Sequence, residues 1–183
     1  MIQLPFQSFF SQWILPFLIA IPIALFLKTF FFTFVWVKGK SMEDTLLSGS
    51  LLFVTKFEHF FTLPKRHQIV LCRFPNRKEY FIKRIIGLPN ETIAFVYDDL
   101  SKQNITLINN DPLNEPYLSP KRNGFPREKD ALLLEEKNYF VAGDNRISSN
   151  DSRNPQVGPL SQKQVVGTVR FVLFPFSRLG KIS

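Results

Sequence analysis

The chain has 183 residues, of which 45% are hydrophobic; this suits one folded domain with or without an anchor and excludes wholesale disorder. Its formal charge of +8 would suit nucleic acid or an anionic membrane, but there is no recognition-helix pattern, zinc-ligand spacing or aromatic RNA-binding signature. We therefore predict no nucleic-acid partner and attribute the charge to nearby anionic lipid headgroups.

The N-terminal segment has the character of a membrane span. Residues 1–8 are predicted to be a short tail and residues 9–28 a transmembrane anchor. Phe9 to Leu27 carries no charge and would be about 28 Å long as a helix, close to the hydrocarbon thickness of a bilayer. A cleaved signal peptide is disfavoured because a basic n-region and a small-x-small exit are missing. A buried soluble helix is disfavoured by apolarity on every face.

Residues 29–183 are predicted to form a mainly β domain of short antiparallel strands, because aromatic and β-branched runs alternate with turns. The expected strands lie at 29–40, Ser50–Lys56, Ile69–Phe74, Tyr80–Ile86, Ile93–Tyr97, Ile105–Ile108, Asn138–Ala142 and Val165–Leu173. Ser41 to Leu47 is expected to be a turn or short helix. An irregular excursion is expected at about 97–137, where Pro, Asn and charged residues are frequent from 109 onward.

The cysteine and the two histidines do not suggest a catalytic or a metal-binding site. Cys72, the single cysteine, lies in an apolar run and is interpreted as a small buried hydrophobe. The two histidines, His59 and His67, lie in polar, loop-like sequence. No Cys–His nucleophile and no zinc site is suggested, and neither a metal nor a cofactor is expected.

A serine and a lysine form the candidate reactive pair. Strand alternation places Lys83 on one face with Phe81 and Ile85, and Arg84 on the other. Burial disfavours the ammonium, and lowering a lysine pKa to ~8 takes roughly 3 kcal/mol. A neutral Lys83 could then activate the Ser41 hydroxyl, which an arginine could not. Taken separately, an ordinary turn serine and an edge-strand lysine are the simpler interpretations.

Three segments, in this order after an anchor, resemble the bacterial type I signal peptidase family. They are Val37–Met42, Phe81–Pro89 and Gly143–Arg153. The resemblance extends to Asn110–Tyr117, Val166–Val169 and Phe174–Pro175, so it covers nearly the whole chain, and its most specific part is the Gly-Asp-Asn-Arg…Asp-Ser-Arg run.

The resemblance implies a signal-peptidase-like β fold and a serine endopeptidase with a Ser–Lys dyad. Such an enzyme removes N-terminal signal peptides from exported preproteins, and its substrates carry small residues at the first and third positions before the cut. The resemblance also implies a single-pass protein of the bacterial cytoplasmic membrane with its catalytic domain on the outer face. The charge pattern alone leaves the orientation open.

Roles for individual residues follow from the resemblance. Ser41 would be the nucleophile and Lys83 the general base. Met42 would pack beside the nucleophile, and Ser149 would orient the Lys83 amine through a hydrogen bond. The oxyanion would bind backbone N–H groups near Ser41. A second donor is unassigned because Gly39 stands where some members carry a hydroxyl.

The segment from Gly143 supplies the remaining supporting residues. Asp144 would pair with Arg84 across the sheet. Asp151 would pair with Arg153 and hold the loop against the site. Gly143 would let the backbone approach the lysine side chain closely, and Asn145 follows in the same run.

Some positions depart from the family pattern. Asp44 occupies a position where the family usually has Pro, and an added carboxylate near Lys83 would raise the pKa of the amine. Ser50 and the Asn90–Glu91 pair also differ from the usual Gly-Asp sequences. These changes favour, as an alternative, a catalytically degenerate membrane-anchored peptide-binding or assembly factor. A peptidase dedicated to one secretion or conjugation substrate also fits. A self-cleaving LexA-like repressor would need a DNA-binding domain where this chain has an apolar segment.

Overall fold

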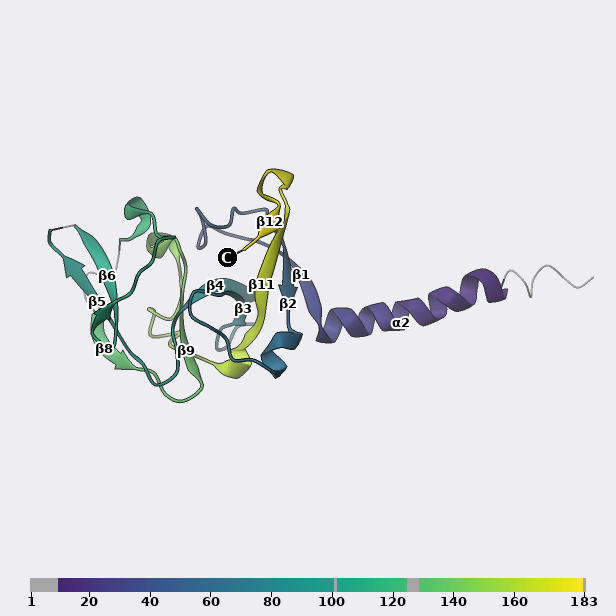
Figure 1. Ribbon diagram of the computed structural model, residues 1–183, viewed down its shortest axis with the longest axis horizontal. Helices are drawn as coiled ribbons and strands as arrows, with labels where there is room; N and C mark the ends of the chain where they lie inside the picture. The colour runs from purple at the N-terminus through teal and green to yellow at the C-terminus, as the bar shows by residue number, and fades with distance from the viewer. Residues whose placement is uncertain (1–9, 101, 125–128, 183) are drawn as a thin grey trace, which may run out of the picture.

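The computed structural model describes residues 10–100, 102–124 and 129–182, and it consists of one long helix and two antiparallel sheets (Figure 1). The predicted mainly β fold with one N-terminal apolar helix is confirmed. The short tail predicted at residues 1–8 lies outside the described residues.

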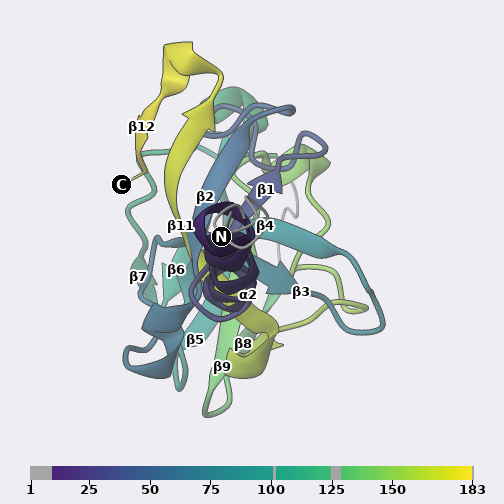
Figure 2. The ribbon, with the colours of Figure 1, turned by 90° about the vertical axis from the view of Figure 1, so that its right-hand side faces the viewer.

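The helix α2, Leu15–Phe30, follows a short π-helical turn η1, Phe10–Ile14, and projects away from the β domain (Figure 1). Together they provide a 19-residue apolar segment, Gln12–Phe30, that is long enough to cross a membrane. Figure 2 shows this helix end on, in front of the domain. Its side chains from Gln12 onward are all exposed, so the helix does not serve as a core element of the domain.

The larger sheet contains eight strands in the order β1-β2-β11-β3-β4-β9-β10, with β12 paired to β11. The bounds of these strands are β1 Phe32–Trp36, β2 Leu51–Thr55, β3 Ile69–Arg73, β4 Tyr80–Gly87, β9 Asn138–Ala142, β10 Leu160–Ser161, β11 Val165–Phe174 and β12 Gly180–Lys181. Short 3-10 turns connect them at η2 Phe57–Phe60, η4 Arg146–Ser148, η5 Gln162–Gln164 and η6 Phe176–Arg178. All the strands predicted for this sheet are present, within a few residues at their ends.

The excursion is more regular than its composition predicted. Strands β5 Thr92–Asp98, β6 Gln103–Ile108, β7 Asp111–Pro112 and β8 Lys129–Leu133 form a second sheet in the order β7-β6-β5-β8, and a 3-10 turn η3, Pro120–Arg122, follows β7. This sheet lies at the end of the domain opposite α2 (Figure 1). Asn109 and Asn110, which both have positive φ, form the turn between β6 and β7.

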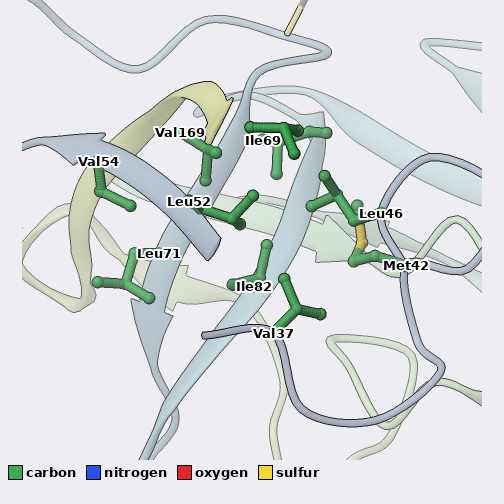
Figure 3. Packing of buried hydrophobic residues seen from close by; sticks show 10 residues of the cluster. Val37, Met42, Leu46, Leu52, Val54, Ile69, Leu71, Ile82 and Val169 are labelled. Carbon is green, nitrogen blue, oxygen red and sulfur yellow. The ribbon is translucent and has the colours of Figure 1, made fainter. Parts of the chain in front are cut away.

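The turn that follows β1 packs against the hydrophobic cluster formed by strands β2, β3, β4 and β11. Figure 3 shows Met42 and Leu46 lying together and packed toward Ile69 and Ile82. Met42 and Leu46 are fully buried, although the turn between β1 and β2 runs over the surface. Burial of two large apolar side chains stabilises this turn by about 3–6 kcal/mol before its ordering entropy is counted. The turn is therefore held to the domain by packing.

A glycine in β11 provides a test of the packing between strands. A Cβ at Gly167 would lie 2.6 Å from the Thr55 carbonyl oxygen and 2.9 Å from Val54 Cγ1. Gly167→Ala should therefore cost about 1–3 kcal/mol, because β2 and β11 must separate locally. Gly180→Ala is the matched control, since its Cβ would meet nothing within 4 Å. Urea unfolding of both variants checks this, and equal stability of the two would contradict the close approach.

Candidate active site

Ser41 lies in the packed turn after β1. The turn is closed by hydrogen bonds from Val37 N to Ser50 O at 2.8 Å and from Gly49 N to Val37 O at 2.9 Å. Gly39 has a φ of 89°, which glycine adopts without strain. The side chain of Ser41 is half-buried, between exposed Lys40 and buried Met42. These hydrogen bonds hold the turn in place, so that the Ser41 hydroxyl lies at the edge of the hydrophobic core and is partly accessible.

Lys83 reaches the Ser41 hydroxyl from β4. Its Nζ lies 2.7 Å from Ser41 Oγ and 3.1 Å from the Ile82 carbonyl oxygen. The residue is only 2% exposed, and the stacked rings of Phe74 and Phe81 lie 5.9 Å from the amine. These contacts agree with the predicted strand alternation. The structure thus joins two side chains that are 42 residues apart in the sequence.

Burial of the Lys83 amine lowers its pKa, and this loss of hydration outweighs the other influences. Cys72 and the carboxylates of Asp151 and Asp144 act in the opposite direction, while Arg153 adds to the lowering. Cys72 is itself buried, and burial raises its pKa to about 12, so its thiol is neutral at neutral pH. The surroundings of Lys83 therefore favour a neutral amine.

Asp44 is not a main influence on the pKa of Lys83, contrary to the expectation. The Asp44 carboxylate lies 3.1 Å from Arg122 Nε, with 42% of its side chain exposed, and the largest influences on the amine come from burial and from other residues. The backbone at Asp44 has a φ of 86°, which the ring of a proline forbids. The carboxylate therefore points to an arginine at the surface.

Asp144 and Arg84 form the expected buried ion pair. Arg84 Nε donates to Asp144 Oδ1 at 2.9 Å, and Nη2 donates to Oδ2 at 2.7 Å. Thr45 donates a third hydrogen bond to the same carboxylate at 2.5 Å. Since Thr45 belongs to the turn that carries Ser41, this bidentate pair ties the loop after β9 to both β4 and the serine turn.

Asp151 and Arg153 are also paired within that loop. Arg153 Nε lies 2.8 Å from Asp151 Oδ1, and Nη2 lies 2.9 Å from Oδ2. Asp151 also accepts from the Gly143 backbone N–H at 2.9 Å, which closes the loop on itself. Hydrogen bonds and Arg153 together hold the pKa of the Asp151 carboxyl below its ordinary value, against the effect of burial.

Two expectations for this loop differ in detail from the structure. Ser149 donates to Asp151 Oδ2 at 2.5 Å, whereas its expected partner was the Lys83 amine, because a carboxylate is the stronger acceptor. The amine donates instead to Ser41 and to the Ile82 carbonyl. A Cβ at Gly143 would lie 2.3 Å from Ser149 Oγ and 2.4 Å from the Ser41 carbonyl oxygen. The close approach at Gly143 thus admits Ser149 and the serine turn rather than the lysine side chain.

Asn145 anchors the loop to the serine turn from the other side. Its backbone N–H donates to the Ser41 carbonyl at 3.0 Å, and its side-chain amide donates to the Lys40 carbonyl at 3.1 Å. In the described part of the chain, the backbone N–H groups of Ser41 and Met42 donate no hydrogen bond. Two donors beside the serine hydroxyl are thus left without an internal acceptor.

A third buried ion pair was missed by the sequence analysis. Arg146 pairs with Glu115, whose carboxylate also accepts from Thr106 and Tyr117, each at 2.7 Å. Glu115 and Thr106 belong to the excursion, so this pair joins the smaller sheet to the loop that carries Asp144. The Glu115-Pro116-Tyr117 run was part of the family resemblance, but nothing in its spacing pointed to Arg146 as partner.

A cleft of about 450 Å³ opens in front of Ser41 and Lys83. One wall comes from Val35 to Lys38 and the other from Arg77 and Glu79 to Lys83. Strand β1 is an edge strand, and β4 pairs with β9 only from Arg84 onward. Both walls therefore expose unpaired strand edges, which can take up an extended peptide. Among the residues that the structure describes, no group of three or more His, Cys, Asp or Glu could hold a metal ion.

The profile of the family described as "Signal peptidase, peptidase S26" matches residues 10–174. A signal peptidase I from Bacillus licheniformis is 36% identical over 181 residues, which cover 93% of this chain and 91% of that protein. Signal peptidase I T from Bacillus subtilis strain 168 is also 36% identical, covering 93% of this chain and 88% of its own length. A solved signal peptidase I from Enterococcus faecalis V583 aligns with 58% of this chain and 97% of its own, with 32% identity and a TM-score of 0.47.

The buried pair of Asp144 with Arg84 should stabilise the domain far more than the exposed pair of Asp44 with Arg122. Asp144→Ala leaves a buried guanidinium without its carboxylate, which costs about 3–5 kcal/mol. Asp44→Ala should cost less than about 1 kcal/mol, because its pair is partly exposed. Denaturant unfolding of the two variants measures both values. A small loss in Asp144→Ala would mean that the loop is not held by this pair.

Proposed function

The chain belongs to the signal peptidase family, peptidase S26, and from that premise we propose that it is a membrane-bound serine endopeptidase that removes N-terminal signal peptides from exported preproteins. The observation that carries the proposal is the 2.7 Å contact between the Lys83 amine and the Ser41 hydroxyl. A hydroxyl needs a base to become a nucleophile, and a neutral amine at hydrogen-bond distance can serve as one.

The base is Lys83 in its neutral form. Its burial against Phe74 and Phe81 supports this assignment, because loss of hydration disfavours the ammonium. The neighbouring carboxylates, which would favour the ammonium, are each paired with an arginine. Arg84 on the opposite face of β4 cannot replace it, since a guanidinium does not give up its proton in proteins.

The reaction proceeds as two acyl transfers. Ser41 Oγ attacks the scissile carbonyl carbon while its proton passes to Lys83 Nζ. The proton then moves to the leaving amine as the C–N bond breaks, which leaves an ester on Ser41. Water then attacks that ester while Lys83 Nζ accepts a proton from it, and this proton passes to Ser41 Oγ as the ester C–O bond breaks. The acid product is released, and the Ser41 hydroxyl and the neutral amine are regenerated. The Ser41 and Met42 N–H groups, which have no internal acceptor, supply the donors for the oxyanion.

The substrate binds in the cleft as an extended strand between β1 and β4. The apolar residues Val35, Val37 and Ile82 line this cleft. This arrangement supports the small residues that the family prefers at the first and third positions before the cut. Main-chain hydrogen bonds from the substrate to the two strand edges provide affinity that does not depend on the other side chains of the substrate.

The helix α2 anchors the enzyme in the bacterial cytoplasmic membrane, with the β domain on the outer face, where exported precursors emerge. A partly exposed aromatic surface on β1, β2 and β11 supports a position of the domain at a membrane surface. These are the strands nearest α2 in Figure 1. The surface consists of Phe32, Phe34, Trp36, Phe53, Phe171 and Phe174, whose rings contact one another in two groups. Aromatic side chains of this kind favour the membrane–water interface.

Ser41→Ala and Lys83→Ala should each abolish cleavage of an exported precursor by the detergent-solubilised protein, a loss of at least about a thousandfold. Lys83→Arg should be equally inactive, because it keeps the charge but offers no base. Ser148→Ala and Lys121→Ala, at exposed positions, are the matched controls and should cleave normally. Electrophoresis of the products with N-terminal sequencing checks the cut after a small residue. Activity in Ser41→Ala would refute the dyad, and an inactive parent would favour a peptide-binding role.

The rate of cleavage should rise with pH and level off once Lys83 loses its proton. Burial lowers the pKa of Lys83 below its ordinary value of 10.5, so the midpoint of the rise lies below pH 10.5. Asp44→Asn should leave this midpoint unchanged, because its carboxylate pairs with Arg122. Measurement of kcat/KM for a soluble peptide across the pH range checks both statements. A midpoint that moves to lower pH in Asp44→Asn would show that this carboxylate does act on the amine.

A further inference from the structure

A large cavity lies away from the cleft, at the base of α2. Its volume is about 830 Å³. Thr29 and Phe30 at the end of the helix form one side, and Val165 and Val166 at the start of β11 form part of the wall. Neither Ser41 nor Lys83 lines it, so it is separate from the candidate active site.

Three lysines from three different segments line this cavity. Lys56 follows β2, Lys137 lies in the turn before β9, and Lys163 lies in η5. A hydrogen bond of 2.8 Å from Gln162 N to Lys137 O holds the last two segments together. The lining contains no Asp or Glu. The charged residues in this lining are therefore all lysines.

The lysines are not neutralised within the protein. In the described ranges none of the three forms an ion pair, and Lys56 Nζ donates only to carbonyl oxygens at the end of α2, 3.2 Å from Thr29 O and 3.5 Å from Lys28 O. The nearby Glu58 is held by Arg170 and Thr55. Gathering like charges around one cavity is unfavourable unless an anion offsets them.

The position of the cavity identifies the kind of anion. The apolar segment ends at Phe30, so a helix that spans the bilayer places Thr29 and Phe30 at the level of the headgroups. A phospholipid presents a phosphate at that level and its acyl chains immediately below. A cavity with lysines at its rim and Phe30 and two valines in its wall is complementary to both parts.

We propose that this cavity binds the headgroup of an anionic phospholipid, with Lys137 and Lys163 as the principal phosphate ligands and the acyl chains lying along Phe30. Lys56 closes the site from the helix side. The proposal rests on the membrane anchor of the proposed function but not on the peptidase reaction. A lipid bound there would fix the tilt of the domain relative to α2, because one wall belongs to the helix and the other to β11.

The test uses the full chain reconstituted in phosphatidylcholine vesicles that contain a trace of spin-labelled phosphatidylglycerol or spin-labelled phosphatidylcholine. The spectra give the fraction of each lipid immobilised by the protein. We expect phosphatidylglycerol to be preferred about thirtyfold, because each of two lysines near the surface contributes about 1 kcal/mol. Lys137→Gln/Lys163→Gln should remove most of this preference.

Lys102→Gln/Lys121→Gln provides the matched control, with the same change of charge in the excursion, at the far end of the domain from α2 (Figure 1). It should keep the preference. Equal loss in both double variants would assign the selectivity to the overall charge and overturn the site. Inorganic phosphate should release no more lipid than chloride at equal ionic strength. Greater release would identify a site for free phosphate and also overturn the proposal.

Failure of the lipid site and failure of the proposed function give different results. Protein that is extracted from the vesicles by alkaline carbonate would refute the anchor, and the lipid site with it. Protein that stays in the bilayer without selecting phosphatidylglycerol refutes the lipid site alone. The Lys137→Gln/Lys163→Gln variant and the parent should cleave a soluble peptide equally well in neutral detergent. Loss of this cleavage in the variant would show that the two lysines act in the peptidase reaction and would overturn their assignment to lipid binding.

Discussion

The arrangement of the candidate site depends on the buried amine of Lys83, which forms no ion pair with a carboxylate in the described residues. A lysine at 2% exposure loses most of its hydration, and a single hydroxyl and a carbonyl are poor compensation for an ammonium. The neutral form is favoured for the same reason, and only the neutral form can take a proton from Ser41. The burial of Lys83 is unfavourable for the ammonium, and the reaction that we propose would require it; groups with perturbed pKa values are common at functional sites.

The arginines near the site help to favour the neutral form of that amine. Asp144 and Asp151 both lie close enough to raise the pKa of Lys83, yet each is held by a bidentate arginine. Pairing cancels most of the negative field that an isolated carboxylate would exert on the amine. The same pairs fix the loop from Gly143 to Arg153 against the serine turn. Positioning and tuning of the base are therefore achieved by one set of contacts.

The sequence predicted the fold class, the helix and the strands of the larger sheet, because strand alternation and apolar runs are local signals. Alternation also placed Lys83 and Arg84 on opposite faces of β4. Contacts between distant segments were predicted only where a family resemblance supplied them, as for Arg84 with Asp144. The pairing of Glu115 with Arg146 and the turn of Asp44 toward Arg122 were missed, because such partners depend on how the excursion folds back onto the domain. Ser149 was assigned to the wrong partner because two acceptors compete for one hydroxyl.

The distance from membrane to cleft follows from chain connectivity. Helix α2 ends at Phe30, β1 begins at Phe32, and Trp36 and Val37 already line the cleft. A strand rises about 3.3 Å per residue, so the near wall of the cleft lies at most about 20–25 Å from the end of the helix. A peptide segment just beyond a membrane-inserted helix would, in the proposed function, lie at the same height above the bilayer as this cleft. The short connection between the anchor and the edge strand would therefore favour substrates that are held at the bilayer surface, although it leaves the cleft open to soluble peptides.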